Sequence, residues 1–364
     1  MNFKQRESGL LVPRYPDGMR VRDRVAPPAK VGARMEGRIH YQLVDREGKI
    51  VDEGESHNLV LDAGLDLVAS HGLGQGIFAY CVVGTGSTAP AATDTGLVAE
   101  LTRTNTTWQG DSTVRTSNGV YDISRYFEFT YGAANGNLTE FGFSPNSAAG
   151  ANLFSRALFR DGGGSPKTIT KTSSEKLRVN YTLTVTLTPV VMTAGSFNIA
   201  NIGTITGNYM LLGYYSDGHC ANPDLGTFNA LAQGIGTLAG GIYELTAAGG
   251  LQVDSNDASG LAYATAPPTS GTRGTLNAHG TASGRDAYTP GSHQRTGGSW
   301  FFDTDYGDIA IEAFYIGGRA ATWNSGINLC GALGYVFDLD AGMTFTKDNL
   351  HTLTIGAPTV SWSR

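Results

Sequence analysis

Charged residues are scarce in this chain of 364 residues, in which Asp, Glu, Lys and Arg together make up 16 %. Cysteine is rarer still, because Cys81, Cys220 and Cys330 lie far apart and form no Cys-x-x-Cys pair. We expect buried thiols in a protein made in a reducing cytoplasm, and no disulfide framework. The sequence has no long apolar run and no apolar stretch at its start, so it predicts neither a membrane span nor a signal peptide.

The short motifs of common enzymes are also missing. The sequence contains no phosphate-binding loop, no Gly-x-Ser-x-Gly elbow and no His-Glu-x-x-His helix. The glycine-rich run at 72–76 has the wrong spacing for a dinucleotide site, and the histidines are dispersed. We therefore predict no catalytic residue and no cofactor, and we expect a protein that is not an enzyme.

Two late segments are candidates for binding. Asp303, Asp305 and Asp308 could collect oxygen ligands around Ca²⁺, but they lack the final acid of an EF-hand, and such clusters also form ordinary turns. No metal is therefore assigned. Aromatic residues crowd the segment 300–323, where most are expected to form a core. Trp323 and Asn324 differ because they lie in a polar, glycine-rich loop, where an indole beside an amide suits surface binding of a sugar.

What the sequence has in quantity is glycine, with 50 residues, and the strand formers Thr, Tyr, Phe and Val. This composition predicts an all-β fold. The clearest strand covers 177–188, where alternate residues are apolar, which predicts one buried face and one face that is wet or interfacial. The pattern also predicts a hairpin over 38–58 and strands at 102–108 and 120–131, separated by a polar loop at 111–119.

We divide the chain into three parts. Residues 1–37 form an extended, basic, proline-containing arm, and residues 38–190 form a β-sandwich of the jelly-roll or immunoglobulin-like kind with short helices. Residues 191–364 form a second β-domain with long loops rich in Gly, Ser and Thr. An alternative for the last part is an insertion, after which the terminal strand returns to the first sheet.

The arm differs in charge from the rest of the chain. Residues 1–38 hold nine Lys and Arg against four Asp and Glu, a net charge of +5 that leaves −11 for the remainder of a chain whose total is −6. A cationic arm on an acidic body can attach one subunit to another. We expect an assembly arm that acts through Arg14, Arg20, Arg22 and Arg24, with a disordered tail as the alternative. Nucleic-acid binding is disfavoured because no aromatic residues are interleaved with these arginines.

The stretch from 58 to 103 organises the first domain. Asp62 is placed to cap a short helix whose apolar face holds Leu65 and Val68, and glycine ends that helix at Gly72. The apolar run 78–83 predicts a buried strand that turns at 84–86. A polar loop follows, and a second short helix is expected at the end of the stretch.

This order of residues resembles tail-fibre, tail-collar and related virion proteins of tailed bacteriophages. The resemblance covers roughly residues 58–188. Its motifs are Val83-Gly84-Thr85-Gly86, Leu97-x-x-Glu100-Leu101-x-Arg103, Glu140-Phe141-Gly142 and the strand ending at Phe159. In such proteins the Glu-x-Gly strand leads through a loop to a second strand.

The resemblance implies a non-enzymatic structural protein of the virion, made in the host cytoplasm. It would belong to the tail, tail fibre or baseplate, form a homo-oligomer, and bind copies of itself, other virion proteins and a host surface glycan. One alternative is a head-decoration or connector-associated virion protein. Another is a carbohydrate-binding or depolymerising protein that carries its site in the late aromatic segment.

Overall fold

A computed structural model describes residues 30–117 and 119–189 continuously. It also describes 193–199, 203–211, 287–296, 335–340 and 359–364, together with a few short strands and helical residues elsewhere. The chain divides into two compact units. Unit 1 comprises Met1–Gly32, Leu187–Ala287 and Gln294–Ser361, and unit 2 comprises Ala33–Thr186, Tyr288–His293 and Trp362–Arg364. In the described part of the chain the secondary structure is mainly strand, which confirms the predicted all-β class.

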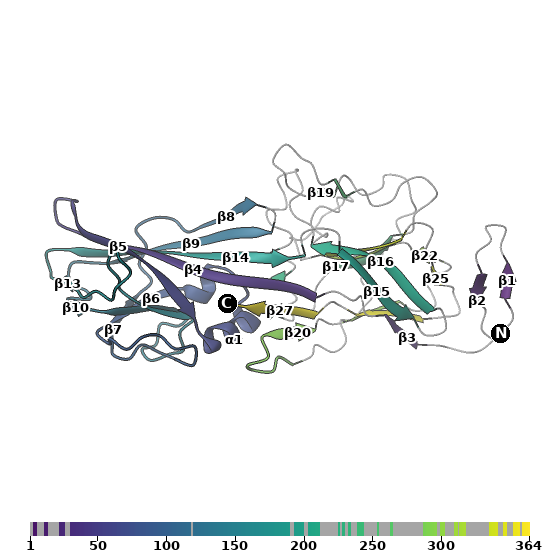
Figure 1. The fold of residues 1–364 in the computed structure, drawn as a ribbon, viewed down its shortest axis with the longest axis horizontal. Helices are drawn as coiled ribbons and strands as arrows, with labels where there is room; N and C mark the ends of the chain where they lie inside the picture. The colour runs from purple at the N-terminus through teal and green to yellow at the C-terminus, as the bar shows by residue number, and fades with distance from the viewer. Residues whose placement is uncertain are drawn as a thin grey trace. The chain divides into compact units, whose positions relative to one another are not determined.

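Unit 2 is organised by one large antiparallel sheet (Figure 1). Its strands follow the order β7-β6-β11-β12-β5-β4-β14-β9-β8. Their bounds are β4 (Lys30–Val44), β5 (Ile50–Val60), β6 (Tyr80–Gly84), β7 (Glu100–Thr104), β8 (Ser112–Ser117), β9 (Val120–Phe129), β11 (Glu140–Ser144), β12 (Ser155–Leu158) and β14 (Lys176–Thr188). A smaller sheet joins β10 (Gly136–Leu138) to β13 (Ile169–Lys171), and the helices are α1 (Asp62–His71) and the 3-10 turn η1 (Gln75–Phe78).

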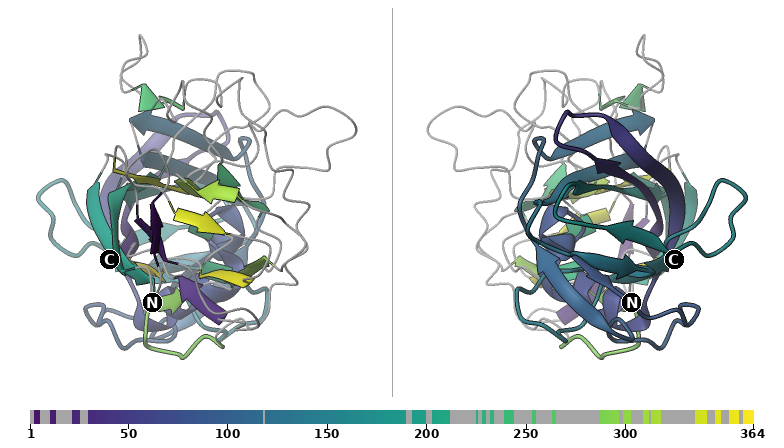
Figure 2. Two further views of the ribbon diagram at one scale, coloured as in Figure 1. Left: turned by 90° about the vertical axis from the view of Figure 1, so that its right-hand side faces the viewer. Right: turned by 90° about the vertical axis from the view of Figure 1, so that its left-hand side faces the viewer.

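The core of unit 2 is aromatic. The alternation predicted for β14 is confirmed, since its odd-numbered side chains from Leu177 to Leu187 are buried and its even-numbered ones are not. Phe143 of β11 stacks on Tyr181 of β14 at 4.0 Å and lies 5.7 Å from Phe127 of β9. The sheet thus curls so that β11 packs against β14 and β9 (Figure 2). This packing is compatible with a sandwich, and the jelly-roll or immunoglobulin-like topology stays a prediction.

Backbone hydrogen bonds also connect the segment that follows β7, the first strand of the order, to β9 near the other end of the order. β7 continues into residues that run beside β9, where Trp108 N–H donates to Tyr126 O at 3.1 Å and Glu128 N–H donates to Thr106 O at 2.9 Å. The segment that leaves β6 therefore reaches β9 before it becomes β8. Backbone groups that an open edge would expose are paired here.

Three local expectations were wrong. Asp62 is the first residue of α1 and not its cap, because the preceding Leu61 occupies the cap position and makes no side-chain hydrogen bond there. The expected second helix is strand β7, and the expected loop at 111–119 contains strand β8. Sheet pairing decides both cases, since β7 lies against β6 and β8 lies against β9.

Strand β4 begins earlier than the predicted hairpin. It starts at Lys30, and its residues Val31, Ala33 and Met35 are buried. Residues 30–37, which the sequence assigns to the arm, are therefore strand residues with core side chains. The basic segment before them contributes β1 (Phe3–Gln5), β2 (Leu11–Pro13) and β3 (Arg22–Val25).

Helix α1 is held by residues from the end of the chain that also belong to unit 2. Trp362 Nε1–H donates to Leu65 O at 2.7 Å, and Arg364 Nη1 pairs with Asp62 Oδ1 at 2.6 Å. Tyr288 O–H donates to Asp66 Oδ1 and stacks on Trp362 at 5.7 Å. The side chain of Asp62, expected to cap the helix, is thus used in an ion pair.

Unit 1 contains a five-stranded sheet in the order β15-β16-β24-β23-β17. Phe197 of β15 packs against Phe337 of β24 at 5.1 Å. The bounds in this unit are β15 (Thr193–Ile199), β16 (Gly203–Leu211), β17 (Ala239–Tyr243), β18 (Val253–Asp254), β19 (Tyr263–Ala264), β20 (Gln294–Thr296), β21 (Ser299–Phe302), β22 (Ile309–Ile311), β23 (Ala313–Gly317), β24 (Tyr335–Leu339), β25 (Phe345–Lys347) and β26 (Thr352–Gly356). The last strand, β27 (Thr359–Ser363), begins in unit 1, and its residues from Trp362 on belong to unit 2. Among the described residues, no helix is long and apolar enough to cross a membrane.

Candidate functional site

The candidate site is formed by two loops of unit 2. One loop, residues 85–99, joins β6 to β7, and the other, residues 145–154, joins β11 to β12. β6 and β11 are neighbours in the sheet, with Gly84 opposite Glu140. The loops meet where Leu153 N–H donates to Thr95 O at 2.9 Å. Several of the motifs singled out in the sequence lie in these loops or on the strands that flank them.

Glu140 holds the first loop by its backbone. Its carboxylate accepts the N–H groups of Gly86 at 2.9 Å, Ala99 at 2.8 Å and Val98 at 3.1 Å. Gly86 is required at this approach, because a Cβ on it would lie 2.4 Å from Glu140 Oε1. One buried carboxylate therefore fixes both the beginning and the end of the loop.

Arg156 of β12 compensates the charge of Glu140. Its Nε and Nη2 lie 3.0 and 2.8 Å from Glu140 Oε2, and the two side chains are 1 % and 0 % exposed. The same guanidinium donates to Asp94 Oδ2 at 2.6 Å and to Thr88 O at 2.7 Å. A buried ion pair is tolerated when its remaining donors and acceptors are satisfied, as they are here. Arg156 thus fixes the middle of the loop whose ends Glu140 holds.

A second pair joins the two loops. Arg103 donates from Nε and Nη2 to the two carboxylate oxygens of Glu100, each at 2.8 Å. Its Nη1 donates to Asn146 O at 2.7 Å, and Glu100 Oε2 accepts Gly150 N–H at 3.0 Å. Glu100 and Arg103 come from β7, so the edge of the sheet positions the second loop.

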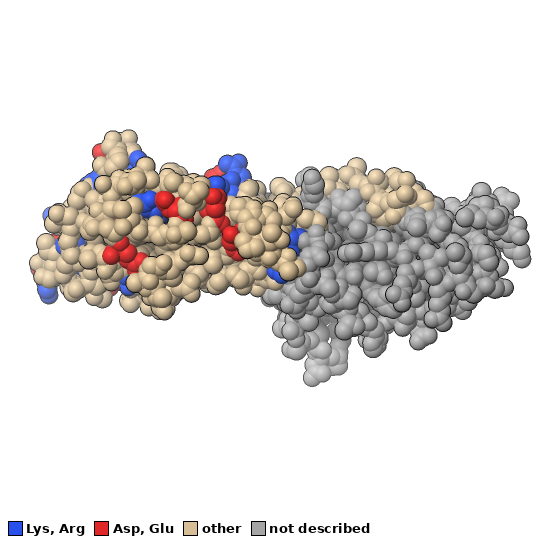
Figure 3. Space-filling view, turned by 90° about the horizontal axis from the view of Figure 1, so that it is seen from below, with Lys and Arg blue, Asp and Glu red and all other residues tan. Residues whose placement is uncertain are grey.

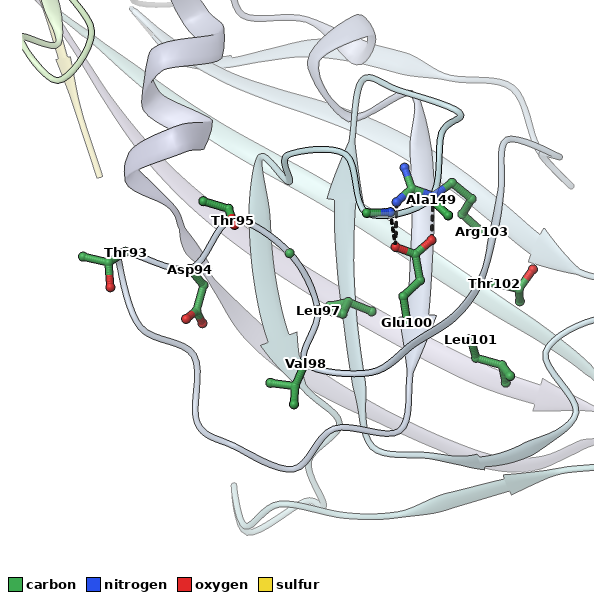
Figure 4. A pocket seen from close by; sticks show the side chains of 12 residues that line it. Thr93, Asp94, Thr95, Leu97, Val98, Glu100, Leu101, Thr102, Arg103 and Ala149 are labelled. Carbon is green, nitrogen blue, oxygen red and sulfur yellow. Dashed lines mark hydrogen bonds and ion pairs between the residues drawn. The ribbon is translucent and has the colours of Figure 1, made fainter.

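A pocket of about 780 Å³ lies over this framework (Figure 4). Dashed lines in the figure mark the contacts of Glu100 with Arg103 and Gly150. Val98 and Leu101 belong to the lining and remain 58 % and 46 % exposed. The lining comprises residues 93–98, 100–103, 149 and 150. Figure 3 shows that charged side chains on one face of unit 2 are scattered among uncharged ones.

The acidic residues of the pocket are held in their ionised forms. Burial would raise the pKa of Asp94, but hydrogen bonds from Ala91 N–H and Arg156 outweigh it and lower that pKa. The hydrogen bond from Arg103 lowers the pKa of Glu100 against the opposing effect of burial. A general acid at neutral pH requires a raised pKa, so the lowered pKa values of Asp94 and Glu100 do not suit that role.

The residues predicted to bind from sequence fall largely outside the described part of the chain. Arg22 and Arg24 lie in β3, which pairs in parallel with β26. Arg14, Arg20, Asp303, Asp305, Asp308, Trp323 and Asn324 lie outside the described residues. Cys81 is buried and free, as expected, whereas Cys220 and Cys330 lie outside the described residues. The described residues include no cluster of metal ligands.

The sequence motifs include Glu140 and Arg156, which hold the first loop, but do not reveal the contacts between them. Glu140 and Arg156 stand sixteen positions apart, and Asp94 is sixty-two positions from Arg156. The signal that could have identified them is the presence of single charges inside otherwise apolar strands, since buried charges require partners.

Comparison with known proteins gives no match to a protein-family model, a curated protein or a solved structure. The resemblance to phage virion proteins therefore rests on the motifs, and the function drawn from it is a proposal.

Proposed function

We propose that this chain is a non-enzymatic structural protein of a tailed-bacteriophage virion, placed in the tail, its fibre or its baseplate, where it forms a homo-oligomer. One observation carries the proposal: the motifs that resemble phage proteins meet in one network. Gly86, Glu100 and Arg103, Glu140, and Arg156 come from four separate motifs, and each belongs to the contacts that fix the two loops. The shared feature is thus a framework for loops.

This framework suits assembly because its loops are already fixed. A partner that binds fixed loops loses less conformational entropy than one that must order them. Val98 and Leu101 then offer apolar contact on a surface whose charges are paired internally. We place contacts with copies of the chain or with other virion proteins at this surface. The basic arm anchors the subunit, and the proposal includes contact with a host surface glycan.

A substitution at the pocket tests the assembly surface. Val98→Asp with Leu101→Asp should leave the melting temperature nearly unchanged, because both residues are exposed, and should prevent incorporation into particles. Val51→Asp is the matched control, since Val51 is 50 % exposed on β5 away from the pocket lining. Incorporation of the double variant at the level of the native protein would contradict the proposed surface.

Imaging of particles that carry a labelled chain tests the location. Label on the tail, fibre or baseplate supports the proposal, and label on the head or connector supports the decoration alternative. A reducing-end assay on host polysaccharide tests the remaining alternative, because released sugar would indicate a depolymerising enzyme. A chain that is absent from particles would overturn the virion assignment altogether.

A further inference from the structure

Beside the face that bears the even-numbered side chains of β14, three cations lie over two aromatic rings. Arg178 Cζ lies 4.5 Å from the centre of the Trp108 ring, and Lys176 Nζ lies 5.2 Å from that of Tyr131. Arg46, in the turn of the β4–β5 hairpin, lies 4.7 Å from the same Tyr131 ring. We call these five residues the cation–aromatic row. They lie outside the pocket described above.

Strand geometry explains the order of the row. Lys176 and Arg178 are two residues apart on β14, so their side chains leave the same face. Glu128 of β9 stands opposite Arg178 and binds both cations, with Oε1 at 2.9 Å from Lys176 Nζ and Oε2 at 3.1 Å from Arg178 Nε. Trp108 is fixed on this face because its Nε1–H donates to Asn180 Oδ1 at 3.2 Å.

The row retains positive charge and available donors. Two of its three cations, Lys176 and Arg178, share the single carboxylate of Glu128, whereas Arg46 lies over Tyr131 and donates to Ser173 O. Burial would raise the pKa of Glu128, but its two cationic partners lower it, so it is ionised. The side chains of Lys176 and Arg178 are 28 % and 29 % exposed. Within the described residues, Arg178 uses Nε for Glu128, and its two terminal nitrogens make no hydrogen bond.

We propose that the cation–aromatic row binds an anionic polysaccharide through the carboxylate or sulfate groups of its sugars. The aromatic rings hold the guanidinium and ammonium groups in place. A planar guanidinium matches the geometry of a carboxylate or a sulfate group. Asn180, Thr182 and Thr184 continue the same face of β14, where Asn180 Oδ1 accepts the Trp108 indole N–H, Thr182 hydrogen-bonds to Ser124 and Thr184 donates to Asp122. Single-stranded nucleic acid is disfavoured, because base stacking needs open ring faces and cations lie over these rings.

This inference deepens the host-glycan part of the proposed function and takes its biological meaning from it, although the binding itself belongs to the isolated chain. The probes are polygalacturonate, dextran sulfate, neutral dextran and an oligo-dT strand, each titrated at low ionic strength. We expect the protein to bind the two acidic polysaccharides and neither of the others. Binding should weaken as salt is added.

Substitutions locate the binding. Arg178→Gln should weaken it about tenfold or more, through the loss of charge-assisted hydrogen bonds. Arg46→Gln provides a second variant in case Arg178→Gln disturbs folding. Arg46 is exposed and its described hydrogen bond is to Ser173 O, so its replacement should leave the fold intact. Arg34→Gln is the control, since it removes the same charge from an exposed pair outside the row and should bind as the native protein does.

Three results would overturn the inference: no binding to either acidic polysaccharide, equal loss in the Arg34 and Arg178 variants, or tighter binding to oligo-dT. Failure of the proposed function is distinguishable. A chain that binds the polysaccharides but is absent from phage particles would keep the row as a glycan site and remove the virion assignment. A chain that is present in phage particles but binds neither acidic polysaccharide would keep the virion assignment and remove the row as a glycan site.

Discussion

Arg156 Nη2 lies 2.8 Å from Glu140 Oε2, and neither side chain is more than 1 % exposed. Removal of one partner leaves the other as an uncompensated charge in the protein interior. We therefore expect Arg156→Met to lower the free energy of unfolding by roughly 3–5 kcal/mol. The measurement is the midpoint of urea denaturation.

The control for this prediction is an ion pair on the protein surface that is exposed to solvent. Arg34 and Glu36 are 67 % and 65 % exposed at 2.8 Å, so Arg34→Met should change the free energy of unfolding by about 1 kcal/mol or less. Similar denaturation midpoints for Arg34→Met and Arg156→Met would show that the buried pair of Arg156 and Glu140 contributes no more to the free energy of unfolding than an exposed pair does.

The register of β14 gives a second prediction. Val185 is 0 % exposed, so Val185→Asp would place a carboxylate in the core and should cost several kcal/mol, in line with a cost of roughly 2–7 kcal/mol for an unpaired buried polar group. Thr186→Asp is the matched change, because Thr186 is exposed. Thr184 is unsuitable, since its hydroxyl donates to Asp122 Oδ1 at 2.7 Å and a second carboxylate there would meet repulsion. Equal melting temperatures for the Val185 and Thr186 variants would refute the register.

Sequence alone was sufficient for β14 because the signal was local. Alternation of apolar and polar residues states directly which side chains face a core, and the strand shows that pattern of burial. The end of α1 was also predictable, since Gly72 adopts a φ of 66° that favours glycine. Both features depend on neighbours along the chain.

Features set by distant contacts were not predictable. The spacing of Leu97, Glu100 and Arg103 imitates a helix, and Glu100 does pair with Arg103, but pairing of Arg103 with Val82 of β6 makes the segment a strand. The same holds for the cation–aromatic row. Trp108 joins it through Asn180, seventy-two positions away, and nothing near Trp108 in the sequence points to that partner.

Acid should weaken unit 2 through Glu100. Its hydrogen bonds from Arg103 hold its pKa below the ordinary value of 4.5, so the folded state favours the ionised carboxylate. The resulting stability is present above the unfolded pKa and is lost as the pH falls through the folded pKa. Melting temperature measured from neutral pH downward should fall below about pH 4.5. Glu100→Gln should reduce that dependence, and an unchanged profile in the variant would exclude this contribution.

Alkali should weaken the attachment of residue 288 to α1. Burial and the hydrogen bond to Asp66 raise the pKa of Tyr288 from 10.0 to about 12, so the folded state favours the neutral phenol. Its contribution is complete below the unfolded pKa and is lost as the pH rises through the folded pKa. Tyr288→Phe removes the titrating group, and its unfolding free energy should fall less steeply from pH 10 to 12 than that of the native protein. Parallel curves would contradict the assignment.

The N-terminal arm gives the last prediction, and the structure fixes where it should be cut. Removal of residues 1–37 would delete Val31 and Met35 from the core, whereas removal of 1–21 keeps both β3 and β4. If the arm attaches the subunit to the particle, the shorter truncation should keep the melting temperature and abolish incorporation.

Charge should account for part of that attachment. Arg14→Gln with Arg20→Gln, in the full-length chain, should lower the salt concentration at which incorporation is lost, because fewer charge contacts remain to resist screening. Lys49→Gln is the control, since it removes a positive charge from an exposed turn outside the arm. A chain without residues 1–21 that enters particles at the native level would show that attachment resides elsewhere, and the exposed Val98 and Leu101 would then be the surface to test first.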